Sequence, residues 1–329
     1  MKPVSHFVAG SISLFLFFLF LAPGVQGAES FPQKPISIII PTEAGADNDV
    51  TVRPLLEKAS ALLPKPFVAV NKPGAGMTLA YREVQKAKPD GHTLGVANAT
   101  IITSKLQGFI PYDYKDFTHL GHYWSMTPVL FASTKVKRPF KTAQEAFAFA
   151  KAHPGEVSLA TTAVGGAFWT AGMLLVNETR LDFNFIPQEG SASFVLAQLA
   201  GGHMDLGIAG TSSAKPQMEA GNILPLAVIG PNRIPGKLNH VPTMTELGYP
   251  VSITTFGSVI GPAKIPQNVC EILIKAIKTG ATDPEYQKFI TSRFDNPWYM
   301  SPTEFYNYCE TQRPKFINVF EKAGLLKVK

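Results

Sequence analysis

The sequence predicts an α/β protein built of two lobes. Short runs rich in β-branched residues alternate with helix-length amphipathic stretches, a pattern typical of mostly parallel sheets with helices on both faces. About 300 residues follow the N-terminal segment, and a chain of that length usually divides between two lobes. Since the chain shows no internal repeat, low-complexity tract or flexible linker, we expect strands that cross between the lobes rather than separate domains.

The first 27 residues have the pattern of a signal peptide. Lys2 precedes an apolar run from Ile12 to Ala22, which is about half of the roughly 20 residues that a membrane-spanning helix needs. Small residues follow the run, and cleavage is expected near Gly27. With no cysteine nearby, the mature chain is expected in the periplasm and not as a lipoprotein; an uncleaved membrane anchor is the alternative.

The charge balance excludes few partners but argues against nucleic acid. The chain has 30 Lys and Arg against 24 Asp and Glu, a formal charge of +6. These charges are spread without long basic runs and are screened within about 8 Å at physiological salt. A small excess of this kind favours anionic ligands slightly, and no nucleic-acid partner is predicted.

The sequence does not decide whether its two cysteines form a disulfide. Cys270 and Cys309 lie far apart in the sequence, and an oxidising compartment would permit a disulfide. Pairing depends on whether the two Cβ atoms come close enough. Two free, mostly buried thiols are an equal alternative.

The strands can be placed with some detail. The first is almost continuously apolar, as a strand covered on both faces should be. The other runs are short and β-branched and lie between turn signals. The predicted strands are Pro35 to Pro41, Phe67 to Asn71, Thr93 to Ala97, Val157 to Thr161, Asn184 to Pro187 and Leu206 to Ala209.

Helices are expected after most of these strands. Helical periodicity predicts a helix from about Asp49 to Leu63, with Pro54 in its first turn or at a kink, because proline has no N–H to donate. Since each strand leads into a turn and a helix start, a ligand site is expected at the carboxyl ends of the strands. Other starts are expected at Thr142 with Glu145, at Ser301 with Glu304, after Gly166, after Ser191 and near Pro216.

A set of short motifs occurs in a characteristic order. It includes Lys34-Pro35-Ile36, Ala44-Gly45, Asp49 with Arg53, Asn71 to Gly76, Pro89 to Leu94, Gly165-Gly166, Gln198 to Gly202, Val241-Pro242-Thr243 and Gly261-Pro262-Ala263. Each motif is weak alone, but together they make the mature chain resemble the substrate-binding proteins of tripartite tricarboxylate transporters, the Bug family.

The resemblance implies a type II periplasmic-binding-protein fold with two hinge strands that cross between the lobes, near Pro128 to Ser133 and near Ser252 to Val259. We expect lobe 1 to comprise residues 28–128 and 252–329, and lobe 2 residues 129–251. The resemblance also implies a small carboxylate ligand, the membrane subunits of a tripartite transporter as partners, and a monomer. Some relatives act as sensors with a two-component kinase, so an extracytoplasmic sensor is the alternative function.

The chemistry expected at the site needs no catalytic side chain. A helix N-terminus offers unpaired N–H groups and about half a positive charge, so it can hold a carboxylate. In the first turn the candidate ligand-binding residues are Thr42, Glu43, Gly45, Ala46, Asp47 and Asp49, with a plain helix N-cap as the alternative role of Asp49. The acids Glu43 and Asp47 depart from the family pattern. They would repel a carboxylate unless they point away, pair with a base, or bind an amino group or a cation.

The remaining candidates follow other strands. In the second turn they are Ala163, Gly165, Gly166, Ala167 and Phe168, although Phe168 and Trp169 fit a place in the core better than a pocket wall. Gln188 and Gly190 follow another strand, where Glu189 again adds negative charge. Asn98, Thr100 and Thr211 offer neutral donors, with ordinary turn and capping roles as the alternative.

No catalytic motif supports an enzyme. The chain lacks a Gly-x-Ser-x-Gly elbow, a His-Glu-x-x-His pair and a phosphate-binding loop. His119 and His122 fit a solvated surface pair better than a zinc site, and Glu43, Asp47 and Asp49 are weak candidates for calcium. We expect no cofactor and no metal, and a secreted α/β enzyme acting on a small carboxylate is the least favoured alternative.

Overall fold

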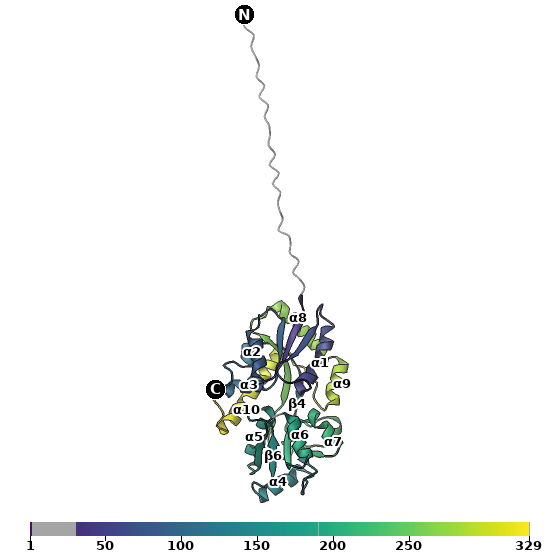
Figure 1. Ribbon diagram of the computed structural model, residues 1–329, viewed down its shortest axis with the longest axis vertical. Coiled ribbons are helices and arrows are strands. Elements are labelled where there is room, and N and C mark those ends of the chain that lie inside the picture. Colours follow the sequence, from purple (N-terminus) through teal and green to yellow (C-terminus); the bar gives the residue numbers. More distant parts are fainter. Residues whose placement is uncertain (2–30, 190, 329) are drawn as a thin grey trace. The chain divides into compact units, whose positions relative to one another are not determined.

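Two five-stranded sheets form the frame of the protein. The computed structural model describes residue 1, residues 31–189 and residues 191–328, so the predicted signal peptide lies outside the described residues. The first sheet has the order β2-β1-β3-β10-β4 and the second the order β7-β6-β8-β5-β9 (Figure 1). The strands are β1 (Ile36–Ile40), β2 (Phe67–Asn71), β3 (Thr93–Ala97), β4 (Phe117–Met126), β5 (Pro128–Ser133), β6 (Ser158–Thr161), β7 (Asn184–Pro187), β8 (Leu206–Gly210), β9 (Ile223–Val228) and β10 (Thr255–Pro262).

Helices cover both sheets. Those that pack with the first sheet are α1 (Asp47–Ser60), α2 (Thr78–Lys86), α3 (Thr100–Leu106), α8 (Gln267–Ala281), α9 (Pro284–Ser292) and α10 (Pro302–Lys322). Those of the second sheet are α4 (Ala143–Ala152), α5 (Ala167–Thr179), α6 (Ala192–Ala200) and α7 (Thr211–Glu219). Three short 3₁₀ turns complete the set: η1 (Ala75–Met77), η2 (Tyr114–Asp116) and η3 (Gly236–Leu238). The predicted two-lobed α/β fold is confirmed.

The chain passes between the sheets twice. The first passage is a single residue, Thr127, between β4 and β5. Met126 before it pairs with Thr255 in the first sheet, and Pro128 after it pairs with Gly210 in the second. The second passage runs through residues 229–254, from β9 to β10.

Strand direction follows from these passages. β1, β2 and β3 are mutually parallel, while β10 is antiparallel to both β3 and β4. β4 therefore runs in the same direction as β1 and β3, and all three end at the edge from which Thr127 leaves. In the second sheet β6, β7 and β8 are parallel and β5 is antiparallel to β8. Because β5 begins at the edge that Thr127 reaches, β6, β7 and β8 end there.

The strand predictions agree closely with these elements, because the buried runs carry a strong signal. β1 is buried at four of its five positions, which explains its continuous apolar sequence. Gly95 in β3 shows how tightly a helix packs on it: a Cβ there would lie 2.5 Å from Cγ2 of Val84 in α2. A larger residue would push α2 off the sheet.

The start expected for the first helix is wrong in detail, and of the two alternatives for Pro54 the place in the first turn is excluded. α1 begins at Asp47, with Ala46 as its N-cap, so Asp49 is not the N-cap but lies in the first turn. Pro54 lies in the interior of the helix rather than in its first turn. The predicted start was late because Asp47 and Asn48 carry no apolar signal, although both have helical backbone.

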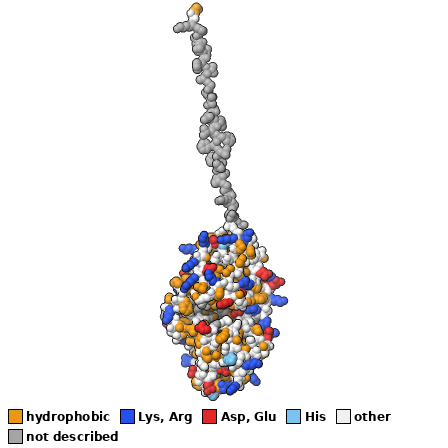
Figure 2. All heavy atoms as spheres, in the orientation of Figure 1, with side chains coloured by type: hydrophobic (Ala, Val, Ile, Leu, Met, Phe, Trp, Pro, Cys, Tyr) orange, Lys and Arg blue, Asp and Glu red, His pale blue; other side chains and the backbone are white. Residues whose placement is uncertain are grey.

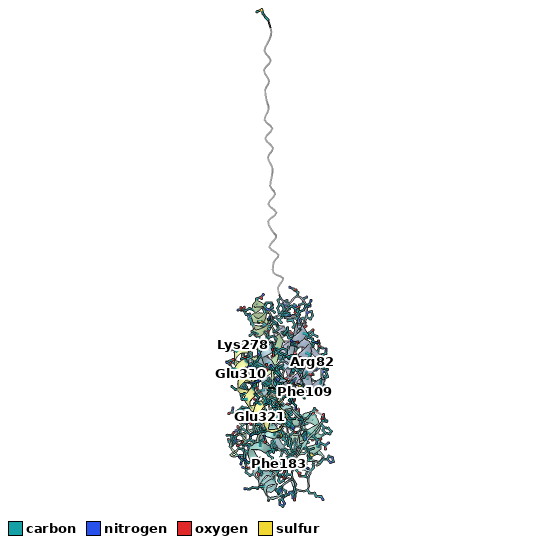
Figure 3. The ribbon with its side chains drawn as sticks, turned by 90° about the vertical axis from the view of Figure 1, so that its left-hand side faces the viewer. Arg82, Phe109, Phe183, Lys278, Glu310 and Glu321 are labelled. Carbon is teal, nitrogen blue, oxygen red and sulfur yellow. The ribbon has the colours of Figure 1, made fainter. Side chains whose placement is uncertain are left out.

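The C-terminal helix α10 joins the two lobes. Ser301 and Glu304 form the predicted capping box, with Pro302 in the first turn. α10 packs against β4 and α3 of the first lobe and against α5 of the second. Figure 3 shows Glu310 and Glu321 along this helix, which runs from the first lobe toward the second. Near its end, the rings of Phe320 and Trp169 lie 6.1 Å apart between centroids.

The prediction that His119 and His122 form a solvated surface pair is wrong. His122 is fully buried in an aromatic cluster, where its Nδ1 donates to the carbonyl of Trp298. Burial lowers the pKa of His122 to about 3, and this hydrogen bond only partly offsets the effect. His119 is bonded to the carbonyl of Tyr114 at 2.7 Å. Both imidazoles therefore have a structural role. No local pattern in the sequence marks this role, because it depends on the burial of β4 on both faces.

Both cysteines are free, which leads to a simple prediction. Cys309 has no exposed surface, and burial raises the pKa of its thiol. We expect a reducing agent to leave the melting temperature unchanged. Iodoacetamide should alkylate Cys270 in the native protein and Cys309 only after denaturation, which peptide mass spectrometry would resolve. A fall in melting temperature on reduction would contradict the free thiols.

Candidate functional site

The site is assembled from turns that the two sheets bring to one gap. β1, β3, β6, β7 and β8 all end at the edges joined by Thr127, and the helices α1, α3, α5, α6 and α7 follow them. The N-termini of five helices are therefore directed toward the space between the sheets (Figure 1). Each contributes unpaired N–H groups and partial positive charge. Nearly all the sequence-predicted site residues lie on these turns; Gly190 lies outside the described residues.

Asp49 holds the first turn in shape. Its Oδ2 accepts a hydrogen bond from the N–H of Gly45 at 2.9 Å, and its Oδ1 accepts from Asn71 at 2.9 Å and from Arg53 at 2.8 Å. Burial raises the pKa of Asp49, but the hydrogen bonds from Arg53, Gly45 and Asn71 outweigh it and the pKa is lowered. With its oxygens bound in this way, Asp49 positions the turn for other residues.

Thr42 and Glu43 begin the same turn in different environments. Thr42 is 9% exposed, and its hydroxyl has no hydrogen-bond partner among the described residues. Its carbonyl accepts from Asn71 at 3.0 Å, so the backbone is fixed while the hydroxyl remains available. Glu43 is exposed, and its carbonyl accepts from the N–H of Ala46. An exposed Glu43 can keep its charge in solvent.

Asp47 reaches across the gap from α1 to α7. Its Oδ1 accepts hydrogen bonds from Ser212 Oγ at 3.1 Å and Ser213 Oγ at 3.3 Å, and lies 3.4 Å from Nη2 of Arg293. Burial raises the pKa of Asp47, while Arg293 and the two hydroxyls act in the opposite direction. This carboxylate thus links the lobes at the N-terminus of α7.

A second carboxyl group lies behind Asp47. The side chain of Asp295 is fully buried, 3.9 Å from Nε of Arg293, and neither of its oxygens has a hydrogen-bond partner in the described part of the chain. Burial and the nearby charge of Asp47 raise its pKa well above the ordinary value. Thr211 is also fully buried here, and its hydroxyl donates to the carbonyl of Phe294 at 3.1 Å. The gap therefore encloses two acids and one guanidinium.

The second predicted turn makes another contact across the gap. Gly165 has φ +84°, and a Cβ on it would lie 2.0 Å from Nε2 of Gln107 at the end of α3. Gly166 is the N-cap of α5, and its N–H donates to the carbonyl of Ala163 at 3.1 Å. Ala167, the first residue of α5, is half-buried. The positive φ favours glycine at position 165, and a larger residue would also displace the end of the Gln107 side chain.

Other predicted residues serve the fold. Phe168, like Trp169, is buried in the core. Asn98 Oδ1 accepts from the N–H of Thr100 at 2.9 Å and from its hydroxyl at 2.7 Å, which is a turn and capping role. The N–H of Gln188 donates to the carbonyl of Thr161 at 2.8 Å. The side chain of Gln188 is half-buried.

The acids of the first turn do not converge on a cation. Asp49 faces Arg53 and Asn71, whereas Asp47 faces α7 and Glu43 is exposed. Across the described ranges, no group of three or more His, Cys, Asp and Glu is arranged to hold a metal ion. No helix in these ranges has the length and apolarity required to cross a membrane.

Four residues of the gap escaped prediction: Gln107, Ser213, Arg293 and Asp295. Gln107, Arg293 and Asp295 lie at no predicted strand end, whereas Ser213 comes two residues after the predicted site residue Thr211. Arg293 and Asp295 follow α9 and approach the gap only because residues 295–300 run alongside β4, with Asn296 bridged to Ser125. No local pattern marks them, since their role depends on the pairing of distant segments.

Comparison with known proteins gives a consistent result. Residues 51–325 match the model of a family described as the tripartite tricarboxylate transporter family receptor. A UPF0065 protein in the gbd 5′ region of Cupriavidus necator is 29% identical over 93% of this chain and 92% of its own length. The protein BugT of Bordetella pertussis is 25% identical over 90% and 91% of the two chains.

Solved structures share the fold. The periplasmic binding protein BugD superposes with a TM-score of 0.77 at 26% identity, covering 91% of this chain and 100% of BugD. The structure of Rpa4515 of R. palustris with adipate superposes with a TM-score of 0.81 at 23% identity, covering 91% and 100% of the two chains.

The bonding of Asp49 predicts a pH-dependent loss of stability. Asp49→Asn should lower the free energy of unfolding by about 2 kcal/mol at pH 7, because three donors lose a charged acceptor. Since the folded-state pKa is lowered, this contribution is present above the ordinary pKa of 3.8 and is lost as pH falls through the folded value. Urea unfolding at pH 7 and at pH 3 measures both effects.

The exposed Asp182 is the matched control, and Asp182→Asn should change stability by less than about 0.5 kcal/mol. Equal effects of the two substitutions, or an Asp49→Asn effect that does not shrink in acid, would count against the role assigned to Asp49.

Proposed function

The chain belongs to the tripartite tricarboxylate transporter receptor family, and from this premise we propose that it captures a small carboxylate-bearing solute between its two lobes and delivers it to a tripartite transporter. Members of the family are periplasmic solute-binding proteins and not enzymes, so the alternative of a secreted enzyme is set aside.

The observation that carries the proposal is the meeting of helix N-termini from both sheets at one gap. An anion placed there can bind backbone N–H groups of both lobes without a lysine or arginine. The proposed contacts are the hydroxyl of Thr42, the N–H groups after Gly45 and Gly166, and Thr211. The adipate in the structure of Rpa4515 supports a carboxylate ligand, because that protein has the same fold.

The acids of the gap narrow the ligand class. Asp47 and Asp295 bring two carboxyl groups against one guanidinium, that of Arg293. Because the guanidinium of Arg293 is already engaged by these two acids, it offers no free positive charge to a trianion, which disfavours the binding of such a ligand. We therefore favour a ligand with one carboxylate head and an apolar or amino-bearing body over a tricarboxylate.

Lobe closure is the proposed mechanism. We take the described residues from Phe31 to Met126 and from Thr255 onward as one lobe and the segment that carries β5 to β9 as the other, with hinges at Thr127 and in the second passage. Among the contacts that join the lobes in this structure are those of Asp47 with Ser212, Gln107 with Gly165, and Trp169 with Phe320. A ligand held by turns of both lobes binds the closed form better than the open form and so shifts the population toward it.

The proposal extends to location and partners. The precursor is cleaved near Gly27 to give a periplasmic monomer without a lipid anchor, and the closed form is recognised by the membrane subunits. A sensor role with a two-component kinase would use the same closed form.

The first experiments test ligand binding without assuming the identity of the ligand. Native mass spectrometry of the purified protein should reveal any retained solute, and a panel of mono-, di- and tricarboxylates should identify binders by thermal shift. A ligand at 100 times its Kd stabilises the folded state by about 2.7 kcal/mol. Absence of any shift across the panel, or chemical conversion of a hit, would sink the proposal.

Gly165 should control closure. Gly165→Ala places a Cβ against Gln107 and should weaken ligand binding roughly tenfold, which corresponds to about 1.4 kcal/mol. Adding Gln107→Ala should restore part of the affinity by removing the clash. Gly221→Ala is the matched control, because Gly221 has φ +70° but a Cβ there has nothing within 4 Å. An equal loss of affinity in this control would remove the argument for a closure contact.

Closure should also depend on pH. In an open form the carboxyls of Asp47 and Asp295 would be solvated, with pKa values near the ordinary 3.8, whereas burial raises both values in the closed form. Closure therefore takes up protons, so it is favoured at low pH and this advantage is lost as pH rises through the raised pKa values. The radius of gyration of the unliganded protein should fall as pH decreases from 8 to 4.5.

Asp295→Asn removes one of the two titrating groups and should flatten this dependence. Small-angle scattering of both proteins over the same pH series checks the expectation. A wild-type radius that does not change, or an equal slope in the variant, would contradict it.

A further inference from the structure

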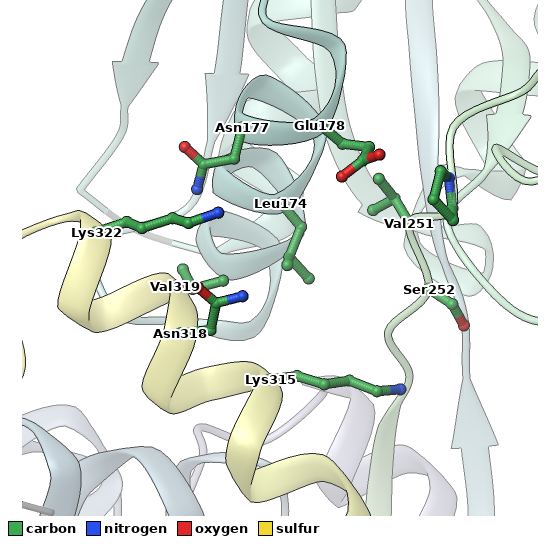
Figure 4. Close-up of a pocket in the computed structure, with 10 residues that line it drawn as sticks. Leu174, Asn177, Glu178, Val251, Ser252, Lys315, Asn318, Val319 and Lys322 are labelled. Carbon is green, nitrogen blue, oxygen red and sulfur yellow. The ribbon is translucent and has the colours of Figure 1, made fainter.

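A second cavity lies between the lobes but away from the helix N-termini. It has a volume of about 220 Å³, opens to solvent, and is lined by α5, α10 and the segment that leads into β10 (Figure 4); the side chains of Lys315 and Lys322 are exposed. Its α5 residues follow the start of that helix by about two turns or more, roughly 10–15 Å along the axis. We call it the α5–α10 cavity; its lining residues are Leu174, Asn177, Glu178, Pro250, Val251, Ser252, Lys315, Asn318, Val319 and Lys322.

Most polar groups of this cavity are donors. Figure 4 shows the amine of Lys322 extending toward Asn177 and that of Lys315 toward Ser252, with Asn318 between the two lysines. The side-chain nitrogen of Asn177 is buried and has no hydrogen-bond partner among the residues described. An amide donor without an acceptor in this position is costly unless a ligand supplies one.

The positive charge of the cavity is not neutralised. No ion pair of Lys315 or Lys322 occurs within the described part of the chain. Lys315 contacts only the amide oxygen of Gln312, at 3.4 Å, and burial lowers its pKa. Glu178 is the single acid of the lining, which leaves one excess positive charge. We propose that the α5–α10 cavity binds a small anion, a phosphate or carboxylate, between Lys315, Lys322 and Asn177.

The size of the cavity limits the ligand. A volume of about 220 Å³ equals that of roughly seven water molecules. It accommodates an inorganic phosphate or a short carboxylate with some water. The ammonium and amide N–H groups would then donate hydrogen bonds to the oxygens of the ligand, as in other anion sites.

The two helices that line the cavity connect the bound anion to lobe closure. α5 belongs to the second lobe, whereas α10 packs against β4 and α3 of the first. An anion held by both helices stabilises the arrangement seen here. By linkage, it raises the population of the closed form and therefore the overall affinity of the protein for the cleft ligand, and the cleft ligand raises the overall affinity for the anion by the same factor.

Calorimetric titration of inorganic phosphate at pH 8 tests the assignment on the full mature protein. Wild type should bind one phosphate outside the cleft. Lys322→Gln and Lys315→Gln should each weaken it about tenfold, and the double variant should abolish it. Glu178→Gln should tighten it, because a repelling charge is removed; a merely structural role of these residues would not produce this opposite effect. A parallel titration with malonate determines whether carboxylates share the site.

Lys151→Gln is the matched control, since Lys151 is an exposed lysine in the last turn of α4 as Lys322 is in that of α10. The side-chain amide resonances of Asn177 and Asn318 should shift on addition of phosphate. Unchanged phosphate affinity in the double variant, an equal loss in Lys151→Gln, or unshifted amide resonances would overturn the proposal.

Discussion

A single-residue passage between the sheets constrains almost everything else in this molecule. Thr127 connects the end of β4 directly to the start of β5, and antiparallel pairing of β10 and β8 with these strands then sets the direction of the rest. As a result the strands that precede helices end at the same gap in both sheets. Helix N-termini and glycine turns meet there because strand direction leaves no other place for them.

The gap combines two opposing electrostatic contributions. Converging helix N-termini favour negative charge, and the protein itself places two carboxyl groups among them, those of Asp47 and Asp295, whose pKa values are raised by burial. Asp47 uses the hydroxyls of Ser212 and Ser213 together with Arg293, so the lobes can meet without a solute. This arrangement explains how acids that seem unfavourable in a carboxylate site are accommodated, and it makes closure a matter of proton uptake as well as of ligand binding.

The two sides of the hinge have different chemistry. The cleft side is lined by backbone N–H groups and buried acids, whereas the α5–α10 cavity is lined by lysines and amides. On the face shown in Figure 2, acidic, basic and hydrophobic side chains are interspersed, without one large patch of a single charge outside the grey residues.

The sequence by itself determined most of the strands, though not β4 or β9, together with several helix starts and the turns that reach the gap, because hydrophobic periodicity, glycine positions and capping residues act over a few neighbours. It misplaced the start of α1, and it misjudged His119 and His122, because burial of β4 depends on α8 and α10 packing over it from far along the chain. Only the tertiary structure decided that Asp49 is bonded within its own turn while Asp47 crosses to α7. It also brought Gln107, Arg293 and Asp295 to the gap, because contacts between distant segments form only once both sheets and the passages between them are in place.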